Sequence, residues 1–400
     1  MKLKDEIILT EYQSVSLKQD SIPLELGEYI WKNYSSQVMI DFPSPKTNWQ
    51  WILINQGWAG YIPVSNELLL VLKPKVPIEN IFRMLEYAFN LRSFYFLQDQ
   101  VQCESLRDFF NILVGILARR ILVRARKGFY KTYKDKNERL PYICGRIDIN
   151  QQIRAPINPS VSCHYQEYTA DIADNQILLW TLYVIICSGL CFEKNLLLAR
   201  RAYRSLQRIV QFHPFTAQSC LNRSYNRLNI DYQPIHNLCW FFLEHCGPKL
   251  AAGKQPMIPF MVSMPHLYQL FVAEWLKAHL PNKLVLKQQE KINVGKDSMI
   301  YFIVDLVIYD KETKEALCVL DTKYKLTESI STNDFSQVVT YALAKDCLEA
   351  LLIYPGKLSN ESNSLIQNIR VTSLSFFIDG DIEMEGDNFL NKLLWVVGYK

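Results

Sequence analysis

Short apolar runs separated by glycine and proline dominate the first 75 residues of the chain. Runs at residues 6–9, 51–54 and 68–75 have the length and spacing of β-strands joined by turns. Apolar residues then recur at three- and four-residue intervals over residues 77–91 and 104–124, which predicts two helices. We therefore expect the N-terminal part to be β-rich at first and then helical.

The middle of the chain shows mainly helical periodicity. Residues 174–210 are predicted to form a helical hairpin, and residues 235–245 a further helix. The uncharged stretch at residues 177–192 is shorter than the roughly 20 residues that a membrane-spanning helix needs, so we expect a buried helix. Residues 247–256 contain several turn-forming residues and are the predicted linker at the main domain boundary.

The second arm of the predicted hairpin carries Arg200, Arg204 and Arg208 at four-residue intervals, and therefore on one helix face. This stripe could contact phosphates or an acidic surface of a partner. It could also be a solvated helix face, which is the more common situation.

The C-terminal part alternates strand and helix patterns in the order α-β-β-β-α-β-β-α. The predicted elements are a helix at 265–280, strands at 283–287, 301–309 and 317–325, a helix at 333–345, strands at 350–354 and 371–378, and a helix at 388–397. This order favours a mixed sheet flanked by helices. The whole chain is therefore expected to be a multidomain protein of the α/β and α+β classes.

Composition agrees with a folded protein of more than one domain. The chain has 400 residues, of which 49% are hydrophobic and 21% charged. A net charge of +4 is compatible with a polyanionic partner. The ten cysteines include no CxxC pair, and several lie in apolar runs, so we expect a reducing cytoplasmic location. The first residues lack the apolar core of a signal peptide.

A basic segment interleaved with aromatic residues covers residues 119–139. It leaves a predicted helix and returns as an apparent strand at residues 140–149, which suggests a projecting hairpin or finger. The alternative is a solvated helix end followed by a lysine-rich loop. In both cases the segment is exposed, and its candidate contacts with a partner or DNA are Arg124, Arg126, Lys127, Lys131, Lys134 and Arg146.

Two neighbouring strand patterns each carry a carboxylate after an apolar run. Asp305 follows one run, Asp321 follows the next, and Lys323 lies two residues beyond Asp321, on the same face of an extended chain. The two carboxylates could hold a divalent cation such as Mg²⁺, while the lysine positions or deprotonates a water molecule. The structural alternative is a salt bridge between Asp321 and Lys323 at the end of a strand.

The predicted helix after these strands supplies further polar groups. It carries Asp334, Gln337 and Tyr341, of which the last two lie four residues apart on one face. The amide and the hydroxyl could orient a phosphate or a nucleic-acid backbone. A polar, solvated helix face is the alternative.

Taken together, Asp305, the Asp-x-Lys pattern at 321–323 and the Gln-x-x-x-Tyr pattern at 337–341 resemble the PD-(D/E)xK nuclease superfamily in its RecB-like form. Segments at residues 72–76, 145–148, 165–175 and 264–272 are also similar to the McrC family. Members of that family are the nuclease subunits of McrBC modification-dependent restriction systems.

This resemblance implies a functional division of the chain. Residues 1–160 would dock on a partner, residues 161–255 would form a helical connecting region, and residues 256–400 would form the nuclease domain. The charge and placement of the basic extension near 119–139 make it our candidate for the docking contact. The implied partner is a McrB-like AAA+ GTPase hexamer that reads methylated DNA, while this chain binds no nucleotide itself. It would stimulate GTP hydrolysis and cut double-stranded DNA, without any membrane association.

The resemblance also implies a site, in which Asp305, Asp321 and the backbone carbonyl of Thr322 hold Mg²⁺ while Lys323 acts on water. Gln269 stands where the family usually has a glutamate. Glu274 is no substitute, because five residues along a helix rotate a side chain by about 140°. The side-chain carbonyl oxygen of Gln269 could take over the role of the missing carboxylate, or the nuclease activity could be weakened. The alternatives are therefore a catalytically weak adaptor of the GTPase ring and a standalone RecB-like repair nuclease.

Overall fold

We describe the fold from a computed structural model that describes residues 5–65, 67–89, 91, 105–153, 159–246, 258–293, 301–325, 330–356, 363–378 and 380–399. The chain divides into unit 1, Met1–Leu106 with Met261–Lys400, and unit 2, Arg107–Phe260. The predicted linker at residues 247–256 lies outside the described residues. The functional division at residues 160 and 255 stays a prediction.

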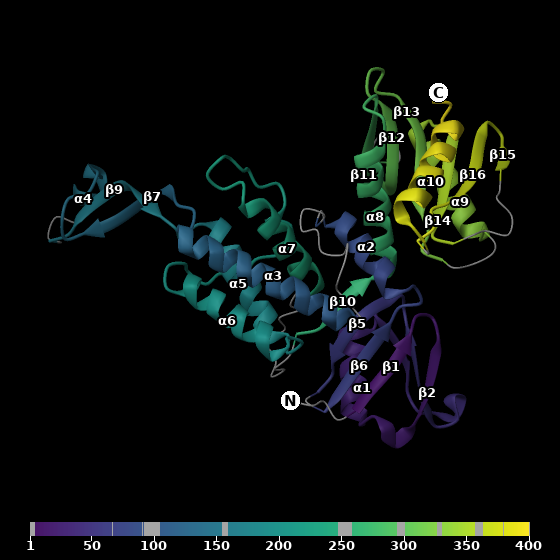
Figure 1. The fold of residues 1–400 in the computed structure, drawn as a ribbon, viewed down its shortest axis with the longest axis horizontal. Coiled ribbons are helices and arrows are strands. Elements are labelled where there is room, and N and C mark those ends of the chain that lie inside the picture. Colours follow the sequence, from purple (N-terminus) through teal and green to yellow (C-terminus); the bar gives the residue numbers. More distant parts are fainter. Residues whose placement is uncertain are drawn as a thin grey trace. The chain divides into compact units, whose positions relative to one another are not determined.

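Two small sheets and two α-helices build the described N-terminal part of unit 1. One sheet has the order β1 (Asp5–Thr10), β6 (Leu68–Lys73), β5 (Trp58–Pro63), β10 (Phe260–Ser263), and the other the order β2 (Ser14–Lys18), β4 (Gln50–Asn55), β3 (Val38–Asp41) (Figure 1). Alternating side chains of β4 and β6, together with α1 (Leu24–Tyr34), enclose one core around Trp51, Leu53 and Leu70. The predicted β-rich start is confirmed, and α2 (Ile78–Ala88) confirms the helix that follows it.

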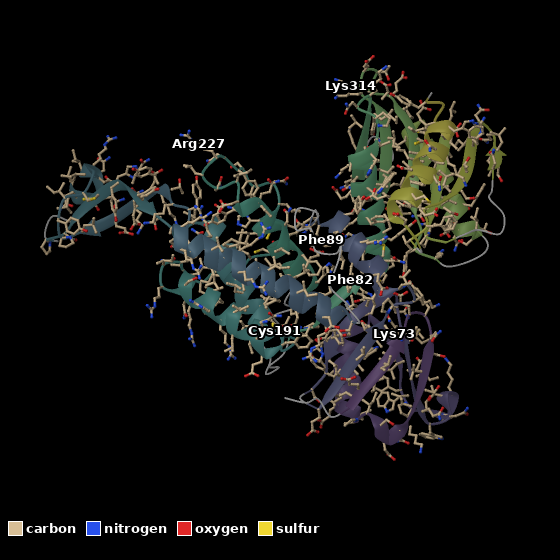
Figure 2. All side chains as sticks on the ribbon, viewed as in Figure 1. Lys73, Phe82, Phe89, Cys191, Arg227 and Lys314 are labelled. Carbon is tan, nitrogen blue, oxygen red and sulfur yellow. The ribbon has the colours of Figure 1, made fainter. Side chains whose placement is uncertain are left out.

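The C-terminal part of unit 1 is a six-stranded mixed sheet flanked by helices (Figure 1). Its strand order is β11 (Leu284–Asn293), β12 (Tyr301–Asp310), β13 (Ala316–Thr322), β14 (Glu349–Tyr354), β16 (Ile369–Ser375), β15 (Asn363–Ile366). The first three strands are antiparallel neighbours, and β13, β14 and β16 run parallel. The β12–β13 hairpin turns through Lys314, labelled in Figure 2, at a φ of 62°.

Three helices pack on this sheet. The helix α9 (Thr332–Lys345) makes the crossover between the parallel strands β13 and β14, and its Val338 and Ala342 pack into a core with Leu352 and Val371. The helices α8 (Met264–His279) and α10 (Ile382–Val396) join another aromatic cluster, in which Trp275 contacts Phe376 and Phe389. The mixed sheet and its helices therefore agree with the fold class expected from the sequence.

Unit 2 combines a helical bundle with an exposed ribbon. Its helices are α3 (Leu106–Lys127), α5 (Ala173–Cys187), α6 (Glu193–Gln207) and α7 (Tyr232–His245), and edge-to-face rings of Phe110 and Phe242 join α3 to α7. The helical hairpin and the buried central helix predicted from the sequence are confirmed as α5 and α6. Among the described helices, none has the length and hydrophobicity needed to cross a membrane.

The basic segment forms the end of α3 and most of β7 (Thr132–Leu140), which pairs with β9 (Val161–Thr169). The ribbon extends beyond the helices of unit 2 (Figure 1), and β7 is exposed along most of its length. The predicted exposed projection is thus confirmed, but its returning arm is β9. The strand expected at residues 140–149 is wrong, because only β8 (Arg146–Ile147) pairs there and α4 (Ile149–Ile153) follows it.

Close packing between α10 and α8 gives a test of this scaffold. A Cβ atom added at Gly386 would overlap the buried Trp275 indole, whereas one added at Gly380 would lie 3.8 Å from its nearest neighbour. We expect Gly386→Ala to destabilise unit 1 by about 1–3 kcal/mol, since overpacking forces neighbouring atoms to move. Gly380→Ala is the matched control. Urea unfolding of both variants checks this, and equal stability of the two would contradict the packing described.

Candidate active site

The antiparallel register of β12 and β13 places the two predicted carboxylates side by side. Leu306 pairs with Leu320, so Asp305 and Asp321 occupy opposite positions at the next step of the ladder. Opposed residues share one face of a sheet, with Cβ atoms roughly 4.5–5.5 Å apart. Thr322 donates to Asp305 Oδ2 from its backbone N at 3.4 Å and its hydroxyl at 3.3 Å. The structure therefore brings the predicted acidic pair together.

Burial makes this acidic pair electrostatically unusual. Asp321 is only 1% exposed, and burial raises the pKa of its carboxyl to about 6 despite the nearby Lys323 ammonium, with the charges of Asp305 and Asp334 adding to the increase. Burial also raises the pKa of Asp305, although Thr322, Lys323 and a hydrogen bond from Gln269 oppose this increase. Asp321 is buried and Asp305 is partly buried, and two mutually repelling carboxylates with little access to water favour a proton or a cation between them.

Lys323 links the acidic pair to α9. Its ammonium lies 2.7 Å from Asp321 Oδ2 and donates to Gln337 Oε1 at 2.8 Å. Gln337 in turn donates to the Tyr341 hydroxyl at 2.7 Å. The predicted Asp-x-Lys and Gln-x-x-x-Tyr groups thus form one connected chain of polar contacts, which fixes the position of the ammonium.

Two further groups lie at this site: Asp334, named from the sequence as a polar helix residue without a role, and Lys325, which was missed. Lys325 forms an ion pair with Asp334 at 2.7 Å, and Asp334 lies 3.9 Å from the Lys323 ammonium. Burial raises the pKa of Asp334, but Lys325, Ser331 and Lys323 together lower it below its ordinary value. The sequence could have indicated Lys325, because Lys323 and Lys325 alternate with Tyr324 and alternate residues of an extended segment share a face.

Tyr324, between the two lysines, is anchored in the N-terminal sheets of unit 1. It is buried, and its hydroxyl donates to Glu11 at 3.4 Å. Glu11 is fully buried, and burial raises the pKa of its carboxyl to about 7 even though Lys75 and Tyr324 oppose this. No sequence pattern connects residues 11 and 324, so this contact depends on the tertiary fold.

Gln269 contacts the acidic pair, since hydrogen bonding by its side chain lowers the pKa of Asp305. Glu274 accepts from Lys277 at 2.6 Å and from Gln288 at 3.1 Å. The carboxylate of Glu274 is therefore occupied elsewhere on α8, as the helical rotation predicts.

The donor set suits a hard divalent cation. Asp321 Oδ2 is buried and, in the part of the chain that the structure describes, accepts no well-aligned hydrogen bond even though the Lys323 ammonium is close. Among these residues, no cluster of three His, Cys, Asp or Glu side chains forms a metal site. Mg²⁺ needs no such cluster, because it commonly binds through one or two carboxylates and keeps several waters. The Thr322 carbonyl stays a prediction as a further ligand.

The predicted basic contacts all belong to unit 2. Arg124 already forms an ion pair with Asp231 at 3.3 Å and lies over the Tyr232 ring, so its side chain serves the packing of α3 on α7. The remaining residues have exposed side chains that are available to a partner, namely Arg126, Lys127, Lys131, Lys134 and Arg146. Their contacts with a partner or with DNA stay a prediction.

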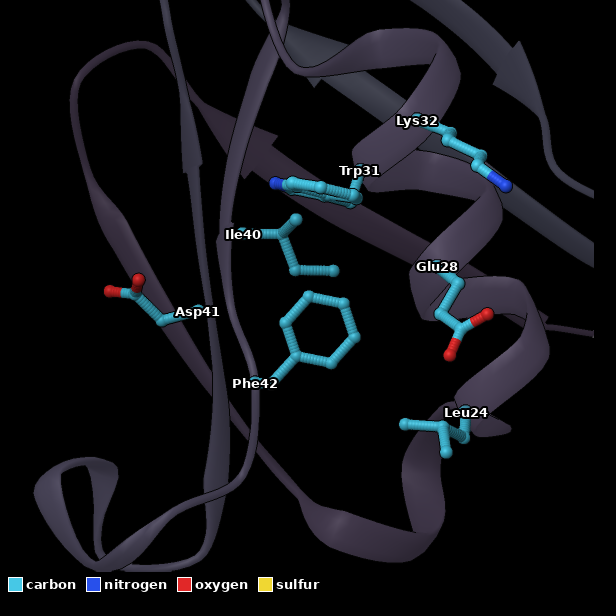
Figure 3. A pocket seen from close by; sticks show the side chains of 7 residues that line it. All are labelled: Leu24, Glu28, Trp31, Lys32, Ile40, Asp41 and Phe42. Atoms are coloured by element: carbon cyan, nitrogen blue, oxygen red, sulfur yellow. The ribbon is translucent and has the colours of Figure 1, made fainter.

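A hollow of about 510 Å³ lies elsewhere in unit 1, between α1 and β3 (Figure 3). Trp31, Ile40 and Phe42 provide its apolar wall, with Leu24 and Glu28 on the helix side. It contains none of the predicted site residues. The acidic pair and its lysine are therefore a more specific candidate for chemistry than this cavity.

Comparisons with known proteins agree with the resemblance inferred from the sequence. A sequence model described as "McrBC 5-methylcytosine restriction system component" matches residues 53–355. No curated protein matches significantly. A chain in the refined half-complex from a tetradecameric assembly of Thermococcus gammatolerans McrB AAA+ hexamers with bound McrC is 15% identical, with a TM-score of 0.55.

That likeness covers 97% of this chain and 100% of the other, and it supports a shared fold. A chain in the cryo-EM structure of the Thermococcus gammatolerans McrBC complex is 16% identical, with a TM-score of 0.44 over 70% of this chain and 89% of that one.

The electrostatics of the acidic pair can be measured directly. We expect Asp321 in the metal-free protein to titrate near pH 6, protonated below and charged above that value. Lys323→Gln should raise this pKa, because the ammonium stabilises the carboxylate, and Asp305→Asn should lower it by removing a like charge. Carbon-13 NMR of aspartate-labelled protein reports each shift, with Asp321→Asn assigning the signal.

Lys345→Gln is the matched control for Lys323→Gln, because it also removes one lysine charge. Lys345 pairs with Glu290, so this substitution should leave the Asp321 titration unchanged. An Asp321 titration near pH 4 in every variant would contradict the burial and charge coupling described here.

Proposed function

Because this chain belongs to the family of McrBC 5-methylcytosine restriction system components, we propose that it is the Mg²⁺-dependent DNA endonuclease subunit of such a system. The family match covers residues 53–355 and confirms the resemblance inferred from the sequence. The observation that carries the catalytic part of the proposal is the register that opposes Asp305 and Asp321 beside the Lys323 ammonium. The proposed domain fold is that of the PD-(D/E)xK nucleases.

Asp305 and Asp321 would hold the cation, with Thr322 supplying a further oxygen from its backbone carbonyl. When bound, Mg²⁺ would polarise the scissile phosphate and lower the pKa of a coordinated water molecule. The acidic pair supports this assignment, because burial raises the pKa of both carboxyls and the charge of Asp305 raises that of Asp321 further, and a shared cation would offset both costs.

Lys323 is the proposed group that acts on water. Its ammonium is held by Asp321 and Gln337 and would orient the attacking water and stabilise the negative charge that develops on phosphate. Gln337 and Tyr341 would fix the position of this ammonium or orient the DNA backbone. Gln269 would hold Asp305 in place through its amide.

The proposed partner is a McrB-like AAA+ GTPase hexamer. The solved assembly with a similar chain contains McrB AAA+ hexamers with bound McrC, and we carry this arrangement over as a proposal. The exposed ribbon of β7 and β9 and the preceding end of α3 are the proposed docking element, through which the chain would stimulate GTP hydrolysis. Double-stranded DNA is the proposed substrate, and the chain itself would bind no nucleotide.

A second candidate function is that of an adaptor that activates the GTPase ring without cutting DNA. Gln269 favours it, since this neutral amide occupies the position of the family glutamate and leaves only two carboxylates facing each other. Under this alternative, the wild-type complex stimulates GTP hydrolysis but yields no DNA cleavage that depends on Mg²⁺. Plasmid cleavage with and without a chelator separates the two functions.

We expect Asp321→Asn and Lys323→Gln each to reduce plasmid cleavage by the assembled complex by at least about 100-fold, because each removes a group that acts directly in hydrolysis. Stimulation of GTP hydrolysis should remain at the wild-type level. Lys345→Gln, which removes a lysine outside the site, should retain cleavage. Cleavage by Asp321→Asn at the wild-type rate would overturn the assignment.

A further inference from the structure

A basic face on α6 has no role in the site described above. Five side chains at or near this helix are exposed: Lys194, Arg200, Arg201, Arg204 and Arg208. With 3.6 residues per turn, they fall within an arc of about 120°. The buried residues Ala199, Ala202 and Leu206 lie on the opposite side, against the bundle. We call the five residues the α6 basic face.

This face is not neutralised within unit 2. In the described part of the chain, none of its five side chains forms an ion pair. Glu193 is the one acidic residue between positions 191 and 216. Other cations of unit 2 do have partners, such as Arg223 with Asp174 at 3.0 Å and Lys136 with Glu167 at 2.8 Å. Like charges four residues apart disfavour a helix, so an external polyanion would relieve a real repulsion.

The spacing along the helix fits a phosphate backbone. Arg200, Arg204 and Arg208 follow one another at steps of about 6 Å, and so span about 12 Å. Each strand of a DNA duplex carries one negative charge per about 3.4 Å of axis, so three to four phosphates lie within that length. Arginine is well suited to them because its planar guanidinium binds phosphate oxygens in pairs.

The chemistry of the face favours DNA over a protein surface. Protein interfaces bury apolar and aromatic residues at their centre and are depleted of charge there. The α6 basic face is instead mostly charged, and Leu197, near the middle of its arc, is the one exposed apolar side chain among its arginines. An acidic protein partner would need a matching row of carboxylates, whereas every duplex presents a continuous row of phosphates.

We propose that the α6 basic face is a sequence-independent contact for the phosphate backbone of double-stranded DNA, separate from the cleavage site. The inference rests on the proposed function, because it takes duplex DNA as the substrate. Contacts to phosphates position a protein on DNA without reading its bases. The face would therefore hold modified and unmodified duplexes equally well.

The test measures binding of a fluorescent duplex to the assembled complex by anisotropy, between about 50 and 200 mM salt. Asp321→Asn is present in every sample, so cleavage does not interfere and a failure of the nuclease assignment does not affect the result. The variant is Arg200→Gln with Arg204→Gln and Arg208→Gln, since glutamine keeps the helix propensity. The control removes three exposed lysines, with Lys18→Gln, Lys46→Gln and Lys311→Gln.

We expect the plot of log affinity against log salt to become shallower by about 0.9 for each phosphate that the protein no longer neutralises, and therefore by roughly 2–3 in the triple variant. The single variant Arg204→Gln should show a change of about 1 in the same slope. Methylated and unmethylated duplexes should be weakened equally, while the lysine control keeps the wild-type slope.

Two results would overturn the proposal. An unchanged salt slope in the triple variant would show that the face is only solvated. If the triple variant binds DNA normally but no longer stimulates GTP hydrolysis in an assay that contains no DNA, the face docks a protein.

Discussion

Two carboxylates, one buried and one partly buried, oppose each other on adjacent strands, and this constraint shapes the site. Asp305 and Asp321 are adjacent because the pairing of Leu306 with Leu320 leaves them no other register. Each carboxylate raises the energy of the other when both are charged, and burial adds to that cost. The Lys323 ammonium compensates part of it. A bound cation would compensate the rest, and this is the basis of the proposal of metal-assisted hydrolysis.

The surrounding fold holds these groups from several sides. The α9 helix is capped at its start by the Ser331 side chain, which accepts a hydrogen bond from Asp334 N. Its Val338 and Ala342 pack on the sheet. This packing places Gln337 beside Lys323. Tyr324 is tied to the buried Glu11 in the N-terminal sheets, so the segment that carries the lysines is not free to move away. Rigid elements with supporting contacts are what a catalytic geometry requires.

Local patterns predicted most of the elements and the polar groups of the site. The apolar runs before Asp305 and Asp321 identified β12 and β13, and helical spacing brought Gln337 and Tyr341 together. Patterns in the sequence carry no information on pairing between distant segments, so β10 in an N-terminal sheet and Glu11 beside Tyr324 were not foreseen. The short edge strand β15 was missed because its four residues are mostly exposed and lack an apolar run.

The central claim is that Asp305 and Asp321 bind one divalent cation between them, and localised hydroxyl-radical cleavage tests it most directly. Fe²⁺ replaces Mg²⁺ in the purified protein, and ascorbate with peroxide then generates radicals at the bound ion. Our account predicts backbone cuts close to residues 305 and 321 that disappear with excess Mg²⁺ and in the Asp321→Asn variant. Cuts at other positions, or cuts near residue 321 that persist in the variant, would contradict it.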